Sequence, residues 1–242
     1  MFDHVTLRVP DLALATAAFK PVLGELEIDQ RLGTTSFSAW GNFGITETDE
    51  EHPIARRVHV AFIAPTQAHV DRFAHAGIEA GFADDGRSGL RPHLAKDYYA
   101  AFLKDRLGNS FEAVHRGGRR PQGSIDHVVI RVADLEASSA FYSTIGAAAG
   151  LTIRHRAADR AAFSVGASDG VFSVVAGDPT EAVHVAFSGQ DDDVRRFHAE
   201  ATAAGYRSNG KPGERPRYHA GYYSAFVLDP DGNNIEVVNR HR

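Results

Sequence analysis

The chain has 242 residues, 43% hydrophobic and 24% charged, a composition typical of folded proteins with one large domain or two small ones. It contains no cysteine, which excludes disulfides, thiolate zinc sites and cysteine nucleophiles and leaves nitrogen and oxygen as metal ligands. The net charge is −5 with mixed signs and no basic stripe, so nucleic acid is not expected as a partner. No signal segment or long apolar stretch is recognisable, so we expect a cytoplasmic protein without a membrane partner.

The first half of the chain shows the pattern of a strand, a helix and further strands twice. Residues 4–9 alternate between apolar and polar side chains, which predicts a strand, and Asp11 is placed to cap a following helix. Short strands are expected near 35–40 and 43–46. Residues 58–63 predict another strand, followed by a helix from about residue 66 to Gly81 and by a hairpin of residues 98–103 and 110–114.

The second half repeats the first, block by block and in the same order. The matching blocks are 3–12 and 126–135, 58–62 and 183–187, 98–102 and 222–226, and 108–112 and 232–236. Such a repeat indicates a duplicated structural unit. Residues 118–124 are polar and rich in glycine and proline, so we predict a linker there between domains of residues 1–117 and 125–242.

The repeated blocks carry the same histidines and the same glutamate. Strand alternation places His4, His59 and Glu112 on the face opposite to their apolar neighbours, with His127, His184 and Glu236 at the matching positions. A single histidine of this kind is more often an ordinary polar residue near a strand end. The recurrence of all three favours a metal site instead, because two imidazoles and a carboxylate form a facial ligand set with positions left for water or substrate.

These motifs resemble those of the vicinal oxygen chelate superfamily, which includes glyoxalases, fosfomycin-resistance enzymes, bleomycin-resistance proteins and extradiol dioxygenases. The resemblance covers both halves and rests on Asp126-His127 opening a strand, on the strand that starts at His184, and on the closing stretch Asp-Pro-Asp-Gly-Asn-Asn-Ile-Glu at residues 229–236. It implies an α+β fold of four βαβββ modules, arranged as two tandem glyoxalase-like domains that form open, U-shaped β-barrels with flanking helices.

The resemblance also implies a divalent metal ion, which could be iron, manganese, nickel, zinc or cobalt, since such ligands do not select one of them. Its ligands would be a first-strand histidine, a fifth-strand histidine and a last-strand glutamate. Carried over, these are His4, His59 and Glu112 in one half and His127, His184 and Glu236 in the other. Modules pair within a half or across halves, so a site that combines His4 with His184 and Glu236 is an open alternative. Glu47 is a candidate fourth ligand, but residues 172–175 offer no matching carboxylate, so three ligands are expected.

Further site residues are predicted around the last hairpin. A turn at residues 229–232 would place Glu236 opposite Ala225, with Tyr223 on the same face. We therefore predict that Tyr223 donates a hydrogen bond at the metal and that His219, which aligns with Ala95, moves a proton. Hairpin packing is the alternative for Tyr223. Candidate substrate-binding residues are Arg8, Arg131, Arg215, Tyr99 and Tyr222, and a structural salt bridge is the alternative for Arg8 and Arg131.

Four kinds of function fit these residues, one of them a metal-bound scaffold whose first half has become structural. The first is a metal-dependent glyoxalase-like lyase or isomerase acting on a small substrate that chelates the metal through two oxygens. Extradiol ring cleavage ranks second, because such enzymes carry a tyrosine about ten residues before the glutamate, where this chain has Phe226 and Phe102. A protein that sequesters an antibiotic or metabolite without catalysis is the third, although such proteins tend to lack the ligands. The second half, which keeps His219, is expected to hold the active site, in a monomer or homodimer.

Overall fold

The structure is a computed structural model that describes residues 1–117, 123–166 and 170–241. The first module comprises β1 (Phe2–Val9), α1 (Leu12–Gly24), β2 (Gln30–Gly33), β3 (Phe37–Trp40) and β4 (Phe43–Glu47). The second comprises β5 (His59–Ile63), α2 (Gln67–Glu79), β6 (Ala83–Leu90), β7 (Tyr99–Lys104) and β8 (Ser110–His115). The third comprises β9 (Ile125–Val132), α3 (Leu135–Thr144), α4 (Gly146–Ala149), β10 (Leu151–Arg156), β11 (Arg160–Val165) and β12 (Val171–Ala176). The fourth comprises β13 (His184–Ser188), α5 (Asp191–Ala203), β14 (Ser208–Glu214), β15 (Tyr223–Leu228) and β16 (Asn234–Asn239).

The strands form two open sheets, in the orders β14-β15-β16-β13-β1-β4-β3-β2 and β10-β11-β12-β9-β5-β8-β7-β6. The predicted α+β fold of four βαβββ modules in open sheets is thus confirmed. By its internal contacts the chain divides into unit 1, residues 1–5 and 130–242, and unit 2, residues 6–129. Most of the predicted linker, residues 118–122, lies outside the described residues, and the sequence-based boundaries at 117 and 125 remain a prediction.

Strand alternation gives β1 one buried face and one half-buried face. Val5, Leu7 and Val9 are buried, whereas His4 is half-buried on the other face. The helix that follows begins as predicted, because the side chain of Asp11 accepts a hydrogen bond from the main-chain nitrogen of Leu14, at 2.8 Å. A polar face is therefore available on the same strand that anchors the core.

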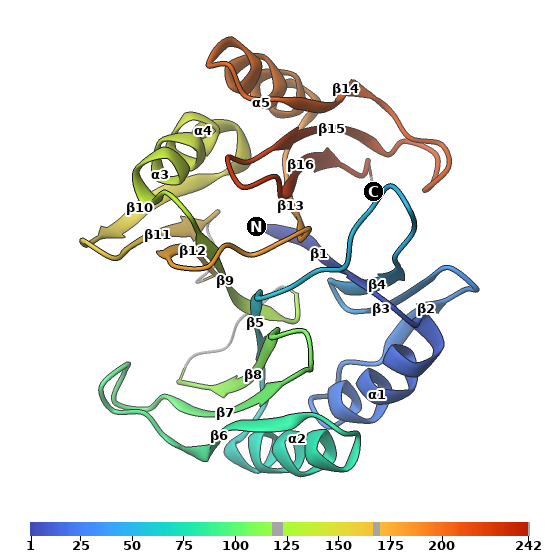
Figure 1. Ribbon diagram of the computed structural model, residues 1–242, viewed down its shortest axis with the longest axis vertical. Coiled ribbons are helices and arrows are strands. Elements are labelled where there is room, and N and C mark those ends of the chain that lie inside the picture. Colours follow the sequence, from blue (N-terminus) through green and yellow to red (C-terminus); the bar gives the residue numbers. More distant parts are fainter. Residues whose placement is uncertain (118–122, 167–169, 242) are drawn as a thin grey trace. The chain divides into compact units, whose positions relative to one another are not determined.

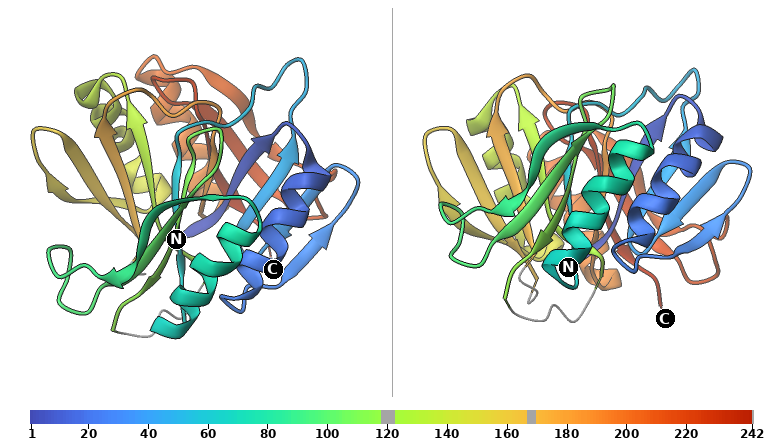
Figure 2. Two further views of the ribbon diagram at one scale, coloured as in Figure 1. Left: turned by 60° about the horizontal axis from the view of Figure 1, so that its bottom comes forward. Right: turned by 90° about the horizontal axis from the view of Figure 1, so that it is seen from below.

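The helices cover the apolar side of the sheets within each unit (Figure 1). In unit 1, α5 packs against β14, β15 and β16 through buried Val194, Phe197 and Ala201, the positions expected from helical spacing. In unit 2, α2 packs against β6, β7 and β8, and α1 lies beside α2 (Figure 2). This arrangement leaves the other face of β5, β8, β13 and β16 for the polar residues of the site.

The edge strands that were not expected from the sequence include β6 and β14. The strands β6 and β14 consist of polar, glycine-rich stretches without alternation, so no strand pattern is visible in them. Each has irregular register with its neighbour, at Gly86 and at Gly210. An edge position tolerates such bulged strands because only one side needs a hydrogen-bonded partner.

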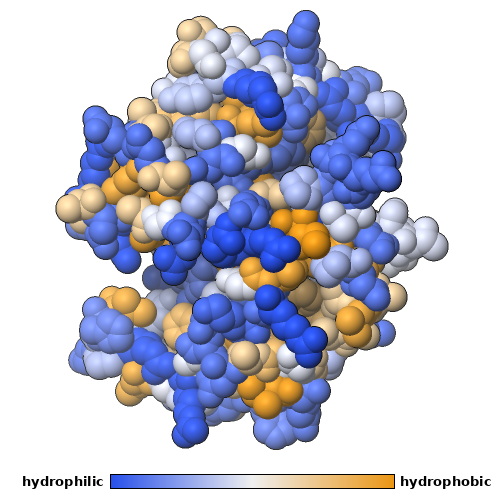
Figure 3. Space-filling model, in the orientation of Figure 1, coloured by the Kyte–Doolittle hydropathy of each residue, from blue (hydrophilic) through white to orange (hydrophobic). Residues whose placement is uncertain are grey.

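The surface carries no extended apolar belt on the face drawn in Figure 3, where hydrophobic side chains form scattered patches among hydrophilic ones. Among the described residues, no helix is both long and apolar enough to cross a membrane.

Candidate metal centres

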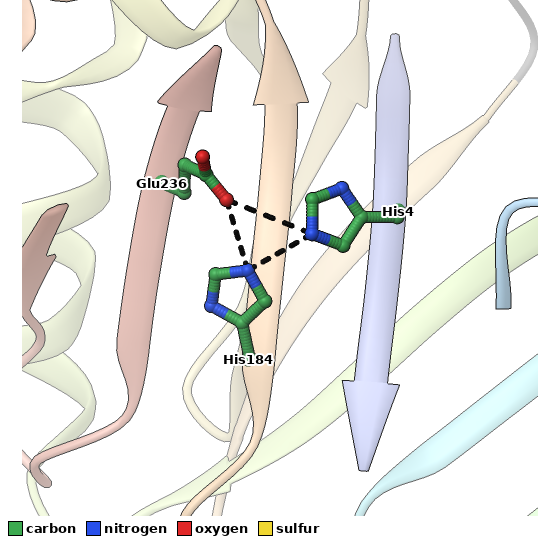
Figure 4. A group of neighbouring side chains, drawn as sticks. All are labelled: His4, His184 and Glu236. Atoms are coloured by element: carbon green, nitrogen blue, oxygen red, sulfur yellow. Dashed lines mark hydrogen bonds and ion pairs between the residues drawn. The ribbon is translucent and has the colours of Figure 1, made fainter. Parts of the chain in front are cut away.

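In unit 1, three side chains from three strands meet at one point, which we call site 1. Nε2 of His184 on β13 lies 3.0 Å from Nε2 of His4 on β1 and 3.0 Å from Oε2 of Glu236 on β16. Oε2 of Glu236 is 3.6 Å from Nε2 of His4. Figure 4 shows the two rings and the carboxylate pointing toward one another. One nitrogen of each histidine and one carboxylate oxygen therefore converge.

In unit 2, the equivalent group forms site 2. Glu112, Ala61 and His127 are direct neighbours across β8, β5 and β9. Nε2 of His59 lies 3.0 Å from Oε2 of Glu112 and 3.2 Å from Nε2 of His127, which is 3.3 Å from the same oxygen. Ala61 lies between Glu112 and His127, and its small side chain leaves the space in which these two larger side chains meet.

Each site combines residues from both halves of the sequence. His4 comes from the first half but joins His184 and Glu236, while His127 comes from the second half but joins His59 and Glu112. The across-half combination, which the sequence left open, is the one that the structure has. Within the described residues, Glu47 belongs to neither group and is exposed at the end of β4.

The first-strand histidine of each site is held by a carboxylate that is itself held by an arginine. Nδ1 of His4 lies 2.6 Å from Oδ1 of Asp3, and the guanidinium of Arg240 binds both oxygens of Asp3. Such a partner fixes the ring orientation and the tautomer of a metal-ligating histidine. The same arrangement recurs in site 2 with His127, Asp126 and Arg116. These partners were not predicted from the sequence, although the repeated Asp-His pair and the arginine four residues after each glutamate were visible signals.

The donor set of site 1 fits a divalent metal ion. When Nδ1 of His4 carries the single ring hydrogen and donates it to Asp3, Nε2 of His4 has a free lone pair. Nδ1 of His184 lies 3.1 Å from the main-chain oxygen of Asn234, to which it donates when its own Nε2 is the bare nitrogen. In that state two nitrogen lone pairs and a buried carboxylate oxygen face one another with no hydrogen between them, and a cation satisfies all three.

The electrostatics of site 2 show what balances the charge when no cation is bound. Burial raises the pKa of Glu112, but hydrogen bonds from His127 and His59 outweigh burial and hold it at about 2. Burial lowers the pKa of His127, but hydrogen bonds to Asp126 and Glu112 outweigh it and raise the pKa to about 9. For His59, burial prevails and the pKa is lowered. A pKa of about 9 favours the protonated form of His127 at neutral pH, in which Nδ1 donates to Asp126 and Nε2 to Glu112.

A buried tyrosine donates a hydrogen bond to the second carboxylate oxygen of each glutamate. The hydroxyl of Tyr222 donates to Oε1 of Glu236 at 2.9 Å, and that of Tyr98 donates to Oε1 of Glu112 at 2.6 Å. Burial is the main cause that raises the pKa of both tyrosines, so both remain protonated donors. Tyr222 was predicted only as a substrate-binding residue, and Tyr98 was not predicted as a site residue.

The expected register of the last hairpin was wrong by one residue. Phe226 lies opposite Glu236, whereas Ala225 lies opposite Val237. The reason is the length of the connection: Leu228 pairs with Asn234, so the connection spans residues 229–233 rather than 229–232. A shift of one residue moves every side chain of a strand to the other face.

The consequence of this register is that Tyr222, which immediately precedes β15, points to the ligand side, where its hydroxyl reaches Glu236, whereas Tyr223 lies on the opposite face of β15. The hydroxyl of Tyr223 is 3.4 Å from Nη1 of Arg195 on α5. In unit 2, the hydroxyl of Tyr99 donates to Asp71 on α2, at 2.8 Å. The catalytic role predicted for Tyr223 and the substrate-binding role predicted for Tyr99 remain predictions, and each hydroxyl has a contact on the helix side.

His219 contacts Tyr222, the tyrosine that donates a hydrogen bond to Glu236 of site 1. Its ring packs edge-on against the ring of Tyr222, with centroids 5.2 Å apart. Nδ1 of His219 lies 2.8 Å from the main-chain oxygen of Ala220, whereas Nε2 is buried and has no hydrogen-bond partner among the described residues. Donation from Nδ1 leaves Nε2 as the acceptor nitrogen of the ring, in the tautomer that a general base uses.

Arg215 stacks over a ring that borders site 1. Its guanidinium carbon is 5.4 Å from the ring centroid of Phe226, which in turn lies 6.0 Å from the ring of His184. Main-chain oxygens, including that of Lys211 at 2.6 Å, accept its hydrogens. The same stack recurs in unit 2 with Arg91, Phe102 and His59.

The remaining predicted arginines lie toward the ends of β1 and β9. Nη1 of Arg8 is 3.9 Å from Asp49 and 3.5 Å from the main-chain oxygen of Glu47, in agreement with the salt-bridge alternative. Arg131 is exposed, and its side chain lies alongside Gly177. Neither contact tests a role in substrate binding.

A comparison with known protein families matches the second half of the chain. Residues 124–237 match the model of the Glyoxalase/Bleomycin resistance protein/Dioxygenase superfamily. This segment belongs to that superfamily. The match confirms the resemblance inferred from the motifs, and the repeated ligand sets relate the first half of the chain to the same pattern. No curated protein sequence matches the chain.

Solved structures show the same fold over nearly the whole chain. Glyoxalase I from Zea mays superposes with a TM-score of 0.67 at 18% identity, covering 99% of this chain and 92% of that protein. A putative dioxygenase from Bacillus subtilis superposes with a TM-score of 0.65 at 13% identity, covering 98% of this chain and 84% of that protein. At these identities the likeness concerns the fold alone, and proteins named as a glyoxalase and as a putative dioxygenase share it.

Proposed function

We propose that the protein is a divalent-metal-dependent enzyme of the glyoxalase-like lyase or isomerase type, acting on a small substrate through two neighbouring oxygens. The observation that carries the proposal is the convergence of two histidine nitrogens and one glutamate oxygen in each unit, all within 4.8 Å of one another. The family of residues 124–237 and the fold shared with glyoxalase I support it.

His4, His184 and Glu236 would hold the ion in site 1. A bound divalent ion would polarise a chelated substrate oxygen and stabilise the negative charge that develops on it. His219 would accept and return the proton that moves, at Nε2, because its Nδ1 is engaged by Ala220. Arg215 would contact the substrate from the edge of Phe226, where its charge favours an anionic group.

Site 1 is proposed as the active site and site 2 as a metal site with a smaller catalytic role. His219 has no counterpart in unit 2, where Ala95 aligns with it and packs near Tyr98. The other parts are alike in the two sites, so the difference concerns proton transfer more than metal binding.

Ring cleavage of the extradiol type is ranked lower, because Phe226 and Phe102 stand opposite the two glutamates and offer no hydroxyl there. A sequestering protein is ranked lower because both ligand sets are complete. This ranking of functions is the same whichever divalent ion the protein binds.

The test combines metal content with a substrate screen. Untagged protein would be analysed for transition metals, reloaded with single divalent ions, and assayed with thiol adducts of dicarbonyl compounds and with catechols. We expect turnover of the thiol adducts, lost in Glu236→Gln and retained in Glu112→Gln. Ring cleavage of catechols would favour a dioxygenase, and tight binding of a ligand without turnover would favour sequestration.

A further inference from the structure

We propose that Tyr222 and Tyr98 are positioning residues that restrict Glu236 and Glu112 to bind the metal through one oxygen only. The inference rests on the proposed metal binding and adds to it how the carboxylate coordinates. No substrate contact is needed for this role.

The two oxygens of each glutamate face different partners. In site 1, Oε2 of Glu236 lies 3.0 Å from Nε2 of His184, whereas Oε1 receives the hydroxyl of Tyr222 at 2.9 Å. In site 2, Oε2 of Glu112 lies 3.0 Å from Nε2 of His59, whereas Oε1 receives the hydroxyl of Tyr98. Both carboxylates are only 1% exposed, so water does not compete for Oε1. A carboxylate that turned to offer both oxygens would leave a buried hydroxyl without its acceptor.

Packing holds each hydroxyl in place. Tyr222 is buried against Ala186 and Val238, and the guanidinium of Arg240 covers its ring at 5.4 Å. Tyr98 packs in the same way against Ala61, Ala100 and Val114. In each site a small alanine side chain, Ala186 on β13 or Ala61 on β5, makes room for the tyrosine ring beside the ligands.

The consequence concerns the number of positions that remain for substrate. With two imidazoles and a single carboxylate oxygen, a six-coordinate ion keeps about three positions, whereas a carboxylate bound through both oxygens would leave about two. One-oxygen binding therefore leaves room for two substrate oxygens and one further ligand. Tyr222 and Tyr98 would thereby favour substrates that chelate over those that bind through one atom.

The test uses full-length protein in which only one site can bind metal. In the Glu112→Gln background, Tyr222→Phe would be compared with Tyr223→Phe, which removes a hydroxyl one residue away on the opposite face of β15. The probe is Mn²⁺, with affinity measured by calorimetry and coordination by the separation of the antisymmetric and symmetric carboxylate bands in infrared difference spectra. Folding would be checked by circular dichroism.

We expect Tyr222→Phe to weaken Mn²⁺ binding by about ten- to a hundredfold and to narrow the band separation toward that of a two-oxygen carboxylate. Tyr223→Phe should change neither quantity. An unchanged separation in folded Tyr222→Phe overturns the inference even if affinity falls, because packing alone would explain the loss. Absence of Mn²⁺ binding in the Glu112→Gln background would overturn the metal site itself.

Tyr98→Phe in the Glu236→Gln background is the independent second variant, with Tyr99→Phe as its control. It keeps the proposal testable if Tyr222→Phe does not fold. The same narrowing is expected for Glu112, and its absence there would contradict the shared role of the two tyrosines.

Discussion

Nε2 of His4 lies 3.0 Å from Nε2 of His184, although 180 residues separate the two histidines. The contact arises because residues 1–5 belong with residues 130–242, while residues 125–129 belong with the rest of the first half. Each ligand set is therefore completed by a strand from the other half of the sequence.

This grouping predicts how ligand substitutions combine. His4→Ala and Glu236→Gln should each remove one equivalent of metal, and the double variant should also lose only one, because both residues belong to site 1. His4→Ala combined with Glu112→Gln should lose two. Metal content per chain, measured by elemental analysis after saturation and desalting, checks the prediction. Grouping within halves would give the reverse pattern for the two double variants.

Metal binding at site 2 should release a proton below about pH 9. Without metal, His127 is protonated because its pKa is raised to about 9, and the ion requires its bare nitrogen. Apparent affinity should then fall by up to about tenfold for each pH unit below that value. Calorimetry at pH 7.5 in two buffers of different ionisation enthalpy, on Glu236→Gln, measures the proton count. Equal heats in both buffers would contradict the charge state assigned to His127.

Asp126→Asn should weaken metal binding at site 2 by about ten- to a hundredfold, as expected for loss of a carboxylate that orients a ligating histidine. The proton released on binding should also decrease, because the hydrogen bond to Asp126 is what raises the pKa of His127 most. Titration with Mn²⁺ in the Glu236→Gln background checks both effects. Asp3→Asn is the matched control, since Asp3 serves His4 in site 1; an equal effect from it would mean that the substitution acts through general destabilisation.

Asp229→Ala should destabilise the fold more than Asp105→Ala. The carboxylate of Asp229 accepts hydrogen bonds from the hydroxyl of buried Tyr142 and from both nitrogens of Asn233. Among the described residues, the carboxylate of Asp105 accepts only bonds from its own turn. We expect a loss of about 2–4 kcal/mol in the free energy of unfolding for Asp229→Ala, because buried donors are left without acceptors. Urea unfolding followed by circular dichroism measures it. A larger loss in Asp105→Ala would show that the Tyr142 contact contributes little.

The faces of the strands could be read from the sequence because side-chain direction alternates with a period of two. That rule placed His59 and Glu112 on one face, and the pairing of Ala61 with Glu112 agrees with it. The face predicted for Tyr223 was wrong because the assumed turn was one residue too short, and the length of a turn is set by its own hydrogen bonds. Asn233, whose main-chain nitrogen bonds to Asp229, lengthens this turn by one residue.

The repeat, the module pattern and the six candidate ligands were thus determined by the sequence alone, since each is a property of local spacing. Which ligands share a site was decided only by the tertiary structure. The strand that opens one half of the sequence lies next to a strand of the other half, β1 next to β13 and β9 next to β5. Such long-range pairing depends on how whole modules pack and not on the local sequence pattern. The buried bonds of Tyr222 and Tyr98 to the glutamates likewise became visible only when the register of each hairpin was known.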